Sequence, residues 1–224
     1  SILTIWAVVT LTFFLVRAMP GGPFDGEKVT AEMKVVLNEK YGLDKPLSEQ
    51  YTMYMKNLLK GDLGESLNFR GRSVSETIAY SFPKSARIGI VAVSFSLIIG
   101  VLLGVISAIK AGKLPDKLCM FISTLGITVP SFVIGAVLIY FFTVKWRLLP
   151  PSGLKGPNTY IMPVIALAGS SMAFITRLTR SKLIDVLKSD YIRTAKAKGL
   201  NSRVVIFKHA LRNSLIPVVT YLGP

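Results

Sequence analysis

Long apolar stretches alternate with polar ones along the chain. Ile2–Met19 holds one charged residue, Arg17, and three further stretches hold none: 88–109, 118–144 and 159–176. At 1.5 Å per helical residue, about 20 residues cross the roughly 30 Å hydrocarbon core of a bilayer. A fifth apolar stretch covers 213–224. The pattern predicts four spans and part of a fifth, so the expected fold class is an all-α polytopic membrane helical bundle.

The alternatives to membrane spans fit poorly. Four buried core helices would need far more surrounding protein than 224 residues supply. A signal peptide at the start is disfavoured, because its apolar run is long and no small-x-small cleavage site precedes Pro20. The expected organisation is a first transmembrane helix over 1–19, an extracytoplasmic helical segment over 20–87 and a core domain over 88–224. Because the chain lacks an initiator Met, we expect its natural start to lie upstream.

Charge predicts the orientation of these spans. The formal net charge is +15. Loop 110–117 holds three lysines against one aspartate, and segment 177–212 holds ten basic against two acidic residues. Short basic loops stay in the cytoplasm, and two spans separate these segments, so both are expected there. The topology explains the basicity without nucleic acid.

Composition excludes several kinds of chemistry. A single Cys and a single His rule out disulfide frameworks and two-histidine metal motifs. The spans contain no Asp, Glu, Lys or His, which argues against a self-powered pump. A membrane-embedded enzyme is disfavoured because Cys119 and His209 are 90 residues apart with no acid placed beside them. A channel lacks its expected charged rings or filter segments.

Two groups of residues inside the spans indicate helix packing and a kink. Small residues recur every four positions in the second span, at Ser96, Gly100, Gly104 and Ala108, which favours close approach of another helix. Pro130 lacks a backbone donor and is expected to kink the third span. That kink, with its neighbours Thr128 and Ser131, either lines a translocation pathway or fits a neighbouring helix.

The outer segment predicts three short helices. Two are amphipathic, at about 30–41 and 46–61, the second with a stripe of Tyr51, Met55, Leu58 and Leu59. Ser73 and Glu76 have capping-box spacing and predict the start of a helix that leads into the second span. The segment is either a cap on the membrane domain or a docking surface for an external partner.

The segment 177–212 predicts two cytoplasmic helices joined by a glycine turn. The first covers Ser181–Lys198 with Leu183, Val186, Leu187 and Ala195 on one side, and Gly199 ends it. Asn201 or Ser202 caps the second, whose expected stripe is Val204, Phe207 and Leu211. A helix that lies on anionic lipid is the alternative interpretation.

Two sequence blocks here carry a resemblance: Asp190-Tyr-Ile-Arg-Thr-Ala-Lys-Ala-Lys-Gly-Leu200 and His209-Ala-Leu-Arg-Asn-Ser-Leu-Ile-Pro217. They resemble the cytoplasmic signature of B-type permease subunits of binding-protein-dependent ABC importers, in the dipeptide/oligopeptide branch. The family's general E-A-A signature matches only at Ala195, Gly199 and Leu211. Further similar blocks are Tyr41-Gly-Leu-Asp-Lys-Pro-Leu47, Gly61-Asp-Leu-Gly-Glu-Ser66 and Thr128-Val-Pro-Ser-Phe132.

The resemblance implies a type I importer transmembrane domain of six spans, of which about four and a half are present. It implies a non-catalytic subunit without a cofactor of its own, in a prokaryotic cytoplasmic membrane and in contact with its lipid. The implied partners are a second homologous permease, an extracytoplasmic solute-binding protein and two cytoplasmic ATPases that bind ATP and Mg. The residues expected to contact an ATPase are Asp190, Tyr191, Arg193, Thr194, Ala195, Lys198, Gly199 and Leu200. No residue distinguishes oligopeptides, dipeptides, nickel chelates or sugars as the solute.

Overall fold

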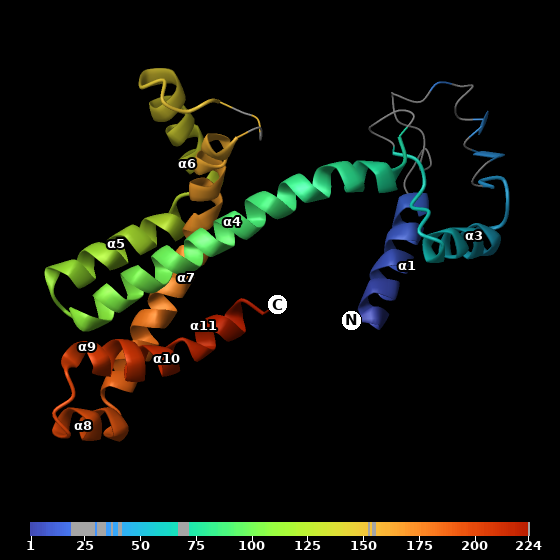
Figure 1. Ribbon diagram of the computed structural model, residues 1–224. Helices are drawn as coiled ribbons and strands as arrows, with labels where there is room; N and C mark the ends of the chain where they lie inside the picture. Colours follow the sequence, from blue (N-terminus) through green and yellow to red (C-terminus); the bar gives the residue numbers. More distant parts are fainter. Residues whose placement is uncertain are drawn as a thin grey trace. The chain divides into compact units, whose positions relative to one another are not determined.

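The computed structural model describes residues 1–18, 30, 35–36, 38–39, 42–66, 72–151, 153 and 156–223. Regular structure in these residues is helical apart from one isolated bridge between Glu65 and Ser73, which confirms the all-α class (Figure 1). The chain forms two compact units, Ser1–Phe82 and Pro83–Pro224. Each unit is a separate packing problem.

The first unit packs an apolar helix against an amphipathic one. In α1 (Ile2–Ala18), Phe13 is buried, and its ring centroid lies 5.3 Å from those of Tyr51 and Tyr54 of α3 (Leu47–Leu59). Thr10 Oγ1 and the Tyr51 hydroxyl are hydrogen-bonded at 2.8 Å. Aromatic packing with a satisfied hydroxyl therefore holds α3 on α1.

Arg17, the one charge of the first apolar stretch, is paired inside the first unit. Its Nε donates to Gln50 Oε1 at 2.7 Å, and its guanidinium lies 3.7 Å from the centroid of the Phe13 ring. Gln50 donates in turn to the carbonyls of Leu43 and Lys45. The one charge of this apolar stretch is therefore paired with a polar side chain of α3 at the end of α1.

The predicted outer helices have different outcomes. Helix α3 matches the expected element, and Gly61 at φ +79° follows its end. Of the predicted stripe, Tyr51 packs against α1, whereas Leu59, at the last position of α3, is 84% exposed. The helix expected over 30–41 lies mostly outside the described residues.

Helix α4 (Val74–Ile109) contains the expected second span and begins well before it. The Ser73 N–H donates to Glu76 Oε2 at 3.1 Å, and the Glu76 N–H donates to Ser73 Oγ at 3.0 Å. This reciprocal pair is the predicted capping box, so that prediction is confirmed.

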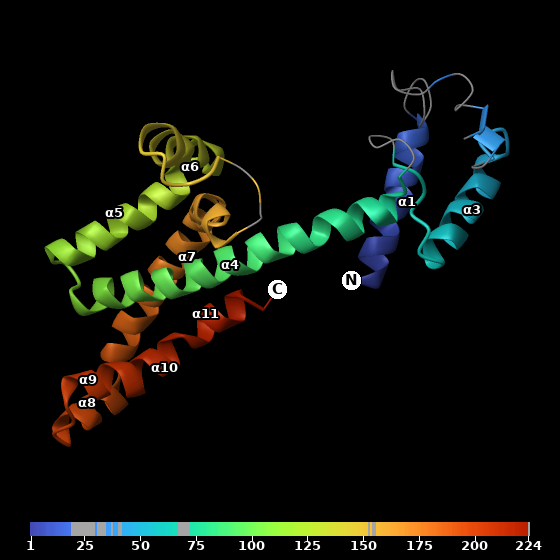
Figure 2. The same cartoon turned by 45° about the horizontal axis from the view of Figure 1, so that its top comes forward.

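The second unit combines long apolar helices with several short segments. The longer members are α4 from Pro83 onward, α5 (Leu114–Thr128) and α7 (Ile161–Leu187). The shorter ones are α6 (Ser131–Leu138), η1 (Ile139–Lys145), η2 (Pro157–Thr159), α8 (Asp190–Ala197), α9 (Ser202–Val204), η3 (Val205–Ala210), α10 (Leu211–Ser214) and α11 (Ile216–Tyr221). Figures 1 and 2 agree that α4 and α5 lie side by side as a hairpin, with α7 crossing them.

Length and composition make two single helices, α4 and α7, candidates for membrane spans. A third candidate is the broken pair Leu114–Thr128 and Ser131–Lys145, whose two parts are bent by 104°. Helix α1 is apolar and shorter, at 17 residues. The break lies at Val129 and Pro130, where Val129 is extended and Pro130 has no N–H to continue the helix.

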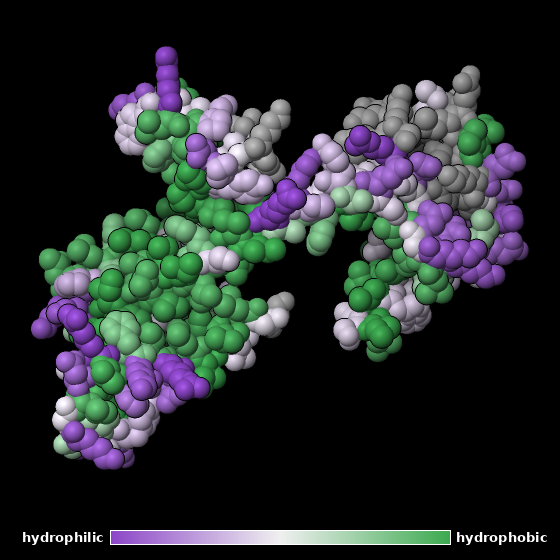
Figure 3. All heavy atoms as spheres, in the orientation of Figure 1, coloured by the Kyte–Doolittle hydropathy of each residue, from purple (hydrophilic) through white to green (hydrophobic). Residues whose placement is uncertain are grey.

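In the second unit several hydroxyl side chains are buried between the helices, while many large apolar side chains are exposed. Ser107, Ser123, Thr176 and Thr179 are fully buried, whereas Phe121 is 61% exposed. Figure 3 shows hydrophobic side chains over much of the face made by α4, α5 and α7. This distribution suits helices surrounded by lipid, because apolar surface gains nothing from burial there and small residues allow close packing.

Candidate functional site

The candidate site is built on the α8 segment, which is attached to the helix bundle by a hydrophobic cluster. The segment's underside contributes Ile192, with no exposed surface, and Ala195. These side chains pack with Leu183 of α7, with Val101, Val105 and Ala108 of α4, and with Val205 and Ala210 of η3. The α8 segment is therefore in contact with both α4 and α7 through this cluster.

The helix that was expected to be continuous over Ser181–Lys198 is in fact broken, so that prediction is wrong. Helix α7 ends at Leu187, and Ser189, in an extended conformation, precedes α8. Ser189 Oγ donates to the Val186 carbonyl at 2.6 Å, so it satisfies a terminal carbonyl of α7. The break makes α8 a separate short element at the end of α7 (Figure 1).

Gly199 ends α8 in a Schellman motif. Its φ is +77°, its N–H donates to the Lys196 carbonyl at 3.0 Å, and the Leu200 N–H donates to the Ala195 carbonyl at 3.3 Å. Both bonds satisfy helix-terminal carbonyls, as the motif requires. The predicted glycine stop is confirmed, and its cause is the backbone conformation alone, since no atom lies within 4 Å of a Cβ built there.

The structure separates the eight predicted contact residues into two groups. Ala195 lies on the buried side of α8. The other seven residues are exposed: Asp190, Tyr191, Arg193, Thr194, Lys198, Gly199 and Leu200. Asp190 and Arg193 form an ion pair at 3.2 Å with side chains 94% and 76% exposed. Such a pair contributes little stability, so both charges are available to a partner.

Tyr191 also connects α8 to the segment that follows the glycine turn. The Asn213 side-chain amide in α10 donates to the Tyr191 hydroxyl at 2.8 Å. Sequence reasoning missed this contact, because 22 positions separate the two residues and nothing in the two motif blocks indicates how they pair. It gives α8 a second attachment besides the hydrophobic cluster.

The second cytoplasmic helix differs from its prediction in which face is buried. Asn201 caps it, since Asn201 Oδ1 accepts from the Arg203 N–H at 2.9 Å. The expected stripe is wrong at two of its three positions. Leu211 packs against the cluster, but Val204 and Phe207 are exposed, and Val205 and Ala210 are buried instead. The reason is that η3 is π-helical, and its wider turn brings residues five apart onto one face.

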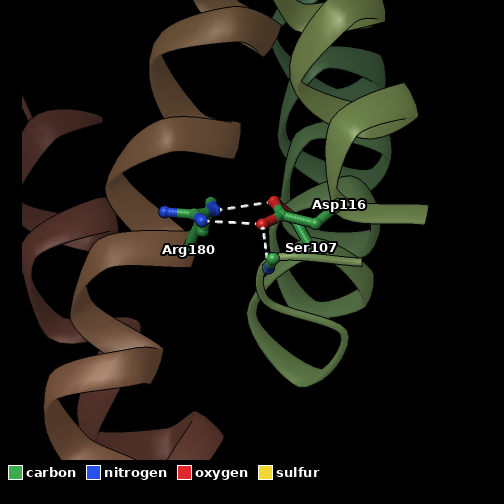
Figure 4. Close-up of polar contacts among 4 residues, drawn as sticks. Ser107, Asp116 and Arg180 are labelled. Carbon is green, nitrogen blue, oxygen red and sulfur yellow. Dashed lines mark hydrogen bonds and ion pairs between the residues drawn. The ribbon is translucent and has the colours of Figure 1, made fainter. Parts of the chain in front are cut away.

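An ion pair between a buried aspartate and a partly exposed arginine lies next to the cluster and was not predicted. Asp116 of α5 is 4% exposed. Its carboxylate accepts two hydrogen bonds from Arg180 of α7, from Nε at 2.8 Å and Nη2 at 2.7 Å, and one from the Gly112 N–H at 2.8 Å. The Ser107 hydroxyl is bonded to the same carboxylate (Figure 4). A lone acid in a loop of lysines was the only sequence signal for it.

The predicted small-residue stripe of α4 lies against α7. Ser96, Gly100, Gly104 and Ala108 are all buried, and the Ser96 hydroxyl reaches the Ala168 carbonyl at 3.1 Å. A Cβ at Gly104 would lie 2.6 Å from Thr179 Cβ, and one at Gly100 would lie 2.9 Å from Ile175 Cγ2. The two helices are therefore too close there to accept a larger residue.

The residues of the predicted kink lie at the break between α5 and α6. Thr128 ends α5, Pro130 precedes α6, and Ser131 begins it; all three are exposed in this chain. The two parts of the helix pair are bent by 104° at these residues, where a kink was expected. These exposed positions are free to contact a solute or another chain.

The described residues offer no metal site beside the α8 segment. No group of three or more His, Cys, Asp or Glu side chains gathers anywhere in the part of the chain that the structure describes. Cys119 is buried and unpaired in α5, where burial favours an inert packing role.

Comparison with known proteins identifies the family. Residues 100–224 match the family described as "Binding-protein-dependent transport system inner membrane component", and residues 1–101 match the corresponding N-terminal family. The chain is 43% identical to a dipeptide transport system permease of Lactococcus lactis, over all of this chain and 74% of that protein. It is 42% identical to an oligopeptide transport system permease of Haemophilus influenzae, over 99% of this chain and 73% of that protein.

The chain is also similar to the oligopeptide transport system permease of Escherichia coli, with 39% identity over all of this chain and 74% of that protein. These relatives are named as permeases, that is, as transport subunits of the membrane and not as enzymes. The matches cover both units and include the α8 segment. This chain therefore belongs to the family of inner-membrane permease components of binding-protein-dependent transport systems.

Proposed function

We propose that this chain is the transmembrane subunit of an ATP-driven importer of peptides, and that α8 is its coupling element. It forms half of the translocation path with a second homologous permease. Two cytoplasmic ATPases bind ATP and Mg, and an extracytoplasmic binding protein delivers the solute. The names of the relatives support peptides as the solute class.

The observation that carries this proposal is the two-sided construction of α8. Its exposed side presents Asp190, Arg193 and Lys198, charged groups suited to a polar groove on a partner. Its other side is inserted into the cluster shared by α4 and α7 through Ile192 and Ala195. A partner that pulls or pushes α8 therefore moves the two helices that qualify as single membrane spans.

The orientation follows from charge. Segments 110–117 and 177–212 carry 13 of the chain's basic residues and belong in the cytoplasm, where the ATPases are. Segment 20–87 then faces the binding protein. Thr128, Pro130 and Ser131, exposed at the bend between α5 and α6, are the proposed contribution to the pathway.

Reconstitution tests the proposal. Vesicles containing this chain, its partner permease and both ATPases are expected to accumulate peptide only when ATP and the binding protein are supplied. ATP hydrolysis should rise when the peptide-loaded binding protein is added. Accumulation in vesicles that lack the ATPases would refute the proposal in favour of a channel or a self-powered carrier.

A further inference from the structure

The ion pair of Asp116 and Arg180 is the strongest feature of the described residues that the proposed function leaves unused. Both oxygens of the Asp116 carboxylate accept from the Arg180 fork, and the Gly112 N–H and the Ser107 hydroxyl complete the network. Bidentate pairs of this kind fix the relative orientation of the elements that carry them. Here those elements are the α4–α5 hairpin and α7.

Local stability alone does not account for this pair. A buried ion pair often contributes no more than an apolar contact of the same volume, because desolvation offsets the attraction. The turn between α4 and α5 also closes without Arg180, since Gly112 has φ +79° and the Lys113 N–H donates to the Lys110 carbonyl at 2.9 Å. What Arg180 adds is a directional link between helices whose sequence positions are 64 residues apart.

The network lies directly beside the cluster that holds α8. Ser107 falls between Val105 and Ala108 on α4, and both of these belong to the cluster. Arg180 lies three residues, or about one helical turn, before Leu183, which also belongs to it. The cluster joins α8 to α4 and α7, whereas it contains no residue of α5. The ion pair connects α5 to α7 at the level of this cluster.

Helix α5 is joined to α7 at two further points along the same side. Ser123 Oγ donates to the Ala173 carbonyl at 3.1 Å, and Gly126 meets Gly169 backbone to backbone. The contacts at Asp116, Ser123 and Gly126 recur at helical spacing, so one face of α5 follows α7 from its first turn to its last. Immediately beyond, the chain bends at Val129 and Pro130.

We infer that Asp116 and Arg180 are a positioning pair that makes α5 move with the coupling element. In this arrangement α4, α5 and α7 turn together when α8 is displaced, and the change in conformation is taken up at the bend after α5. The inference rests on the proposed function, because it assigns α8 as the point where force enters. It adds a specific requirement, a rigid connection between α5 and α7, that the coupling role of α8 does not itself demand.

The experiment uses the complete complex with Asp116→Asn, Arg180→Gln and the double variant. Lys117→Gln is the matched control, because it removes one charge from the same turn of α5 at an exposed position. Uptake and ATP hydrolysis are measured per assembled complex. We expect each single variant to assemble and to hydrolyse ATP, yet to transport at least about fivefold less peptide per ATP, a typical coupling between sites. The double variant should lose no more than either single one.

A distance measurement separates positioning from mere stability. Spin labels are placed at Phe121→Cys on α5 and Lys182→Cys on α7, both exposed, with the buried Cys119 replaced by alanine. In the complex without further changes and in Lys117→Gln, the distribution of distances between the labels should be narrow and should be the same with and without ATP. In Asp116→Asn and in Arg180→Lys, which keeps the charge without the fork, it should broaden or shift when ATP binds.

Each outcome decides the question. Unchanged transport per ATP and an unchanged distance distribution in the assembled variants would overturn the inference. This holds also if the variants merely yield less assembled complex, because such a loss shows a role in stability alone. If the unmodified complex shows no ATP-dependent uptake, the proposed function fails, and the inference with it. If the unmodified complex transports and the variants equal it, only the inference fails.

Discussion

The contact between α5 and α7 at Gly126 and Gly169 gives a sharp prediction, because backbone meets backbone there. A Cβ added at Gly126 would lie 2.5 Å from the Gly169 carbonyl oxygen and 2.9 Å from its carbonyl carbon. Ordinary contact begins at 3.4 Å, so Gly126→Ala leaves the helices about 0.9 Å too close. No side chain is present to rotate away, and the helices themselves must separate.

The magnitude follows from two opposing effects. Overpacking a close contact costs about 1–3 kcal/mol in the free energy of unfolding. Alanine regains about 0.5–1 kcal/mol over glycine in a helix interior. We therefore expect Gly126→Ala to destabilise the protein by about 1–2 kcal/mol. A shift of α5 would also lengthen the neighbouring hydrogen bond from Ser123 to the Ala173 carbonyl.

Thermal unfolding of the purified complex measures this effect. At about 2–4 °C per kcal/mol for a chain of this size, Gly126→Ala should lower the midpoint by several degrees. Gly135→Ala is the control, since its nearest neighbour would be Ala166 Cβ at 3.9 Å, and Gly89→Ala is a second, with no atom within 4 Å. A midpoint for Gly126→Ala equal to those of the two controls would refute the close contact.

Two further predictions concern the coupling segment and the orientation. Gly199→Val should weaken ATPase pull-down and uptake because a β-branched residue is strained at φ +77°, whereas Gly199→Asn, which tolerates that conformation, should retain both; equal behaviour of the two variants would count against the turn. A thiol at Lys60→Cys should react with an impermeant reagent from outside and one at Lys198→Cys only after permeabilisation, and the reverse pattern would overturn the proposed orientation.

Local signals in the sequence were enough to predict several elements. The Ser73 and Glu76 capping box, the proline start and glycine end of α3, and the Gly199 stop each depend on residues within a few positions. Such motifs satisfy backbone groups at helix ends and need no tertiary contact. The apolar stretches were predicted less completely. Helices α4 and α7 are each long and apolar enough to span a membrane, whereas the stretch over 118–144 is bent by 104° and α1 is shorter, at 17 residues.

The failures arise where tertiary packing or an irregular backbone decides the outcome. A period of 3.6 residues predicted Val204 and Phe207 as buried, and the π-helical turn of η3 moved burial to Val205 and Ala210. No glycine or proline lies at the break between α7 and α8, at Lys188 and Ser189, so the sequence does not signal it. The pair of Asp116 and Arg180 was invisible because only the folding of α7 against the α4–α5 hairpin brings the two residues together.

Two kinds of contact hold the second unit together, and we expect each to suit a different surrounding medium, water or lipid. Burying Ile192 and Val205 against α4 and α7 is favourable where the surrounding medium is water, so a hydrophobic cluster suffices to hold α8. In lipid, apolar contact between helices is not favoured in this way. Helix α5 therefore packs on α7 through close backbone approach at Gly126 and a hydrogen bond from Ser123. Asp116 and Arg180 lie where these two regimes meet, at the first turn of α5 beside the cluster. A charge pair is stable there because four hydrogen bonds satisfy the carboxylate, and it links a water-driven contact to a lipid-embedded one.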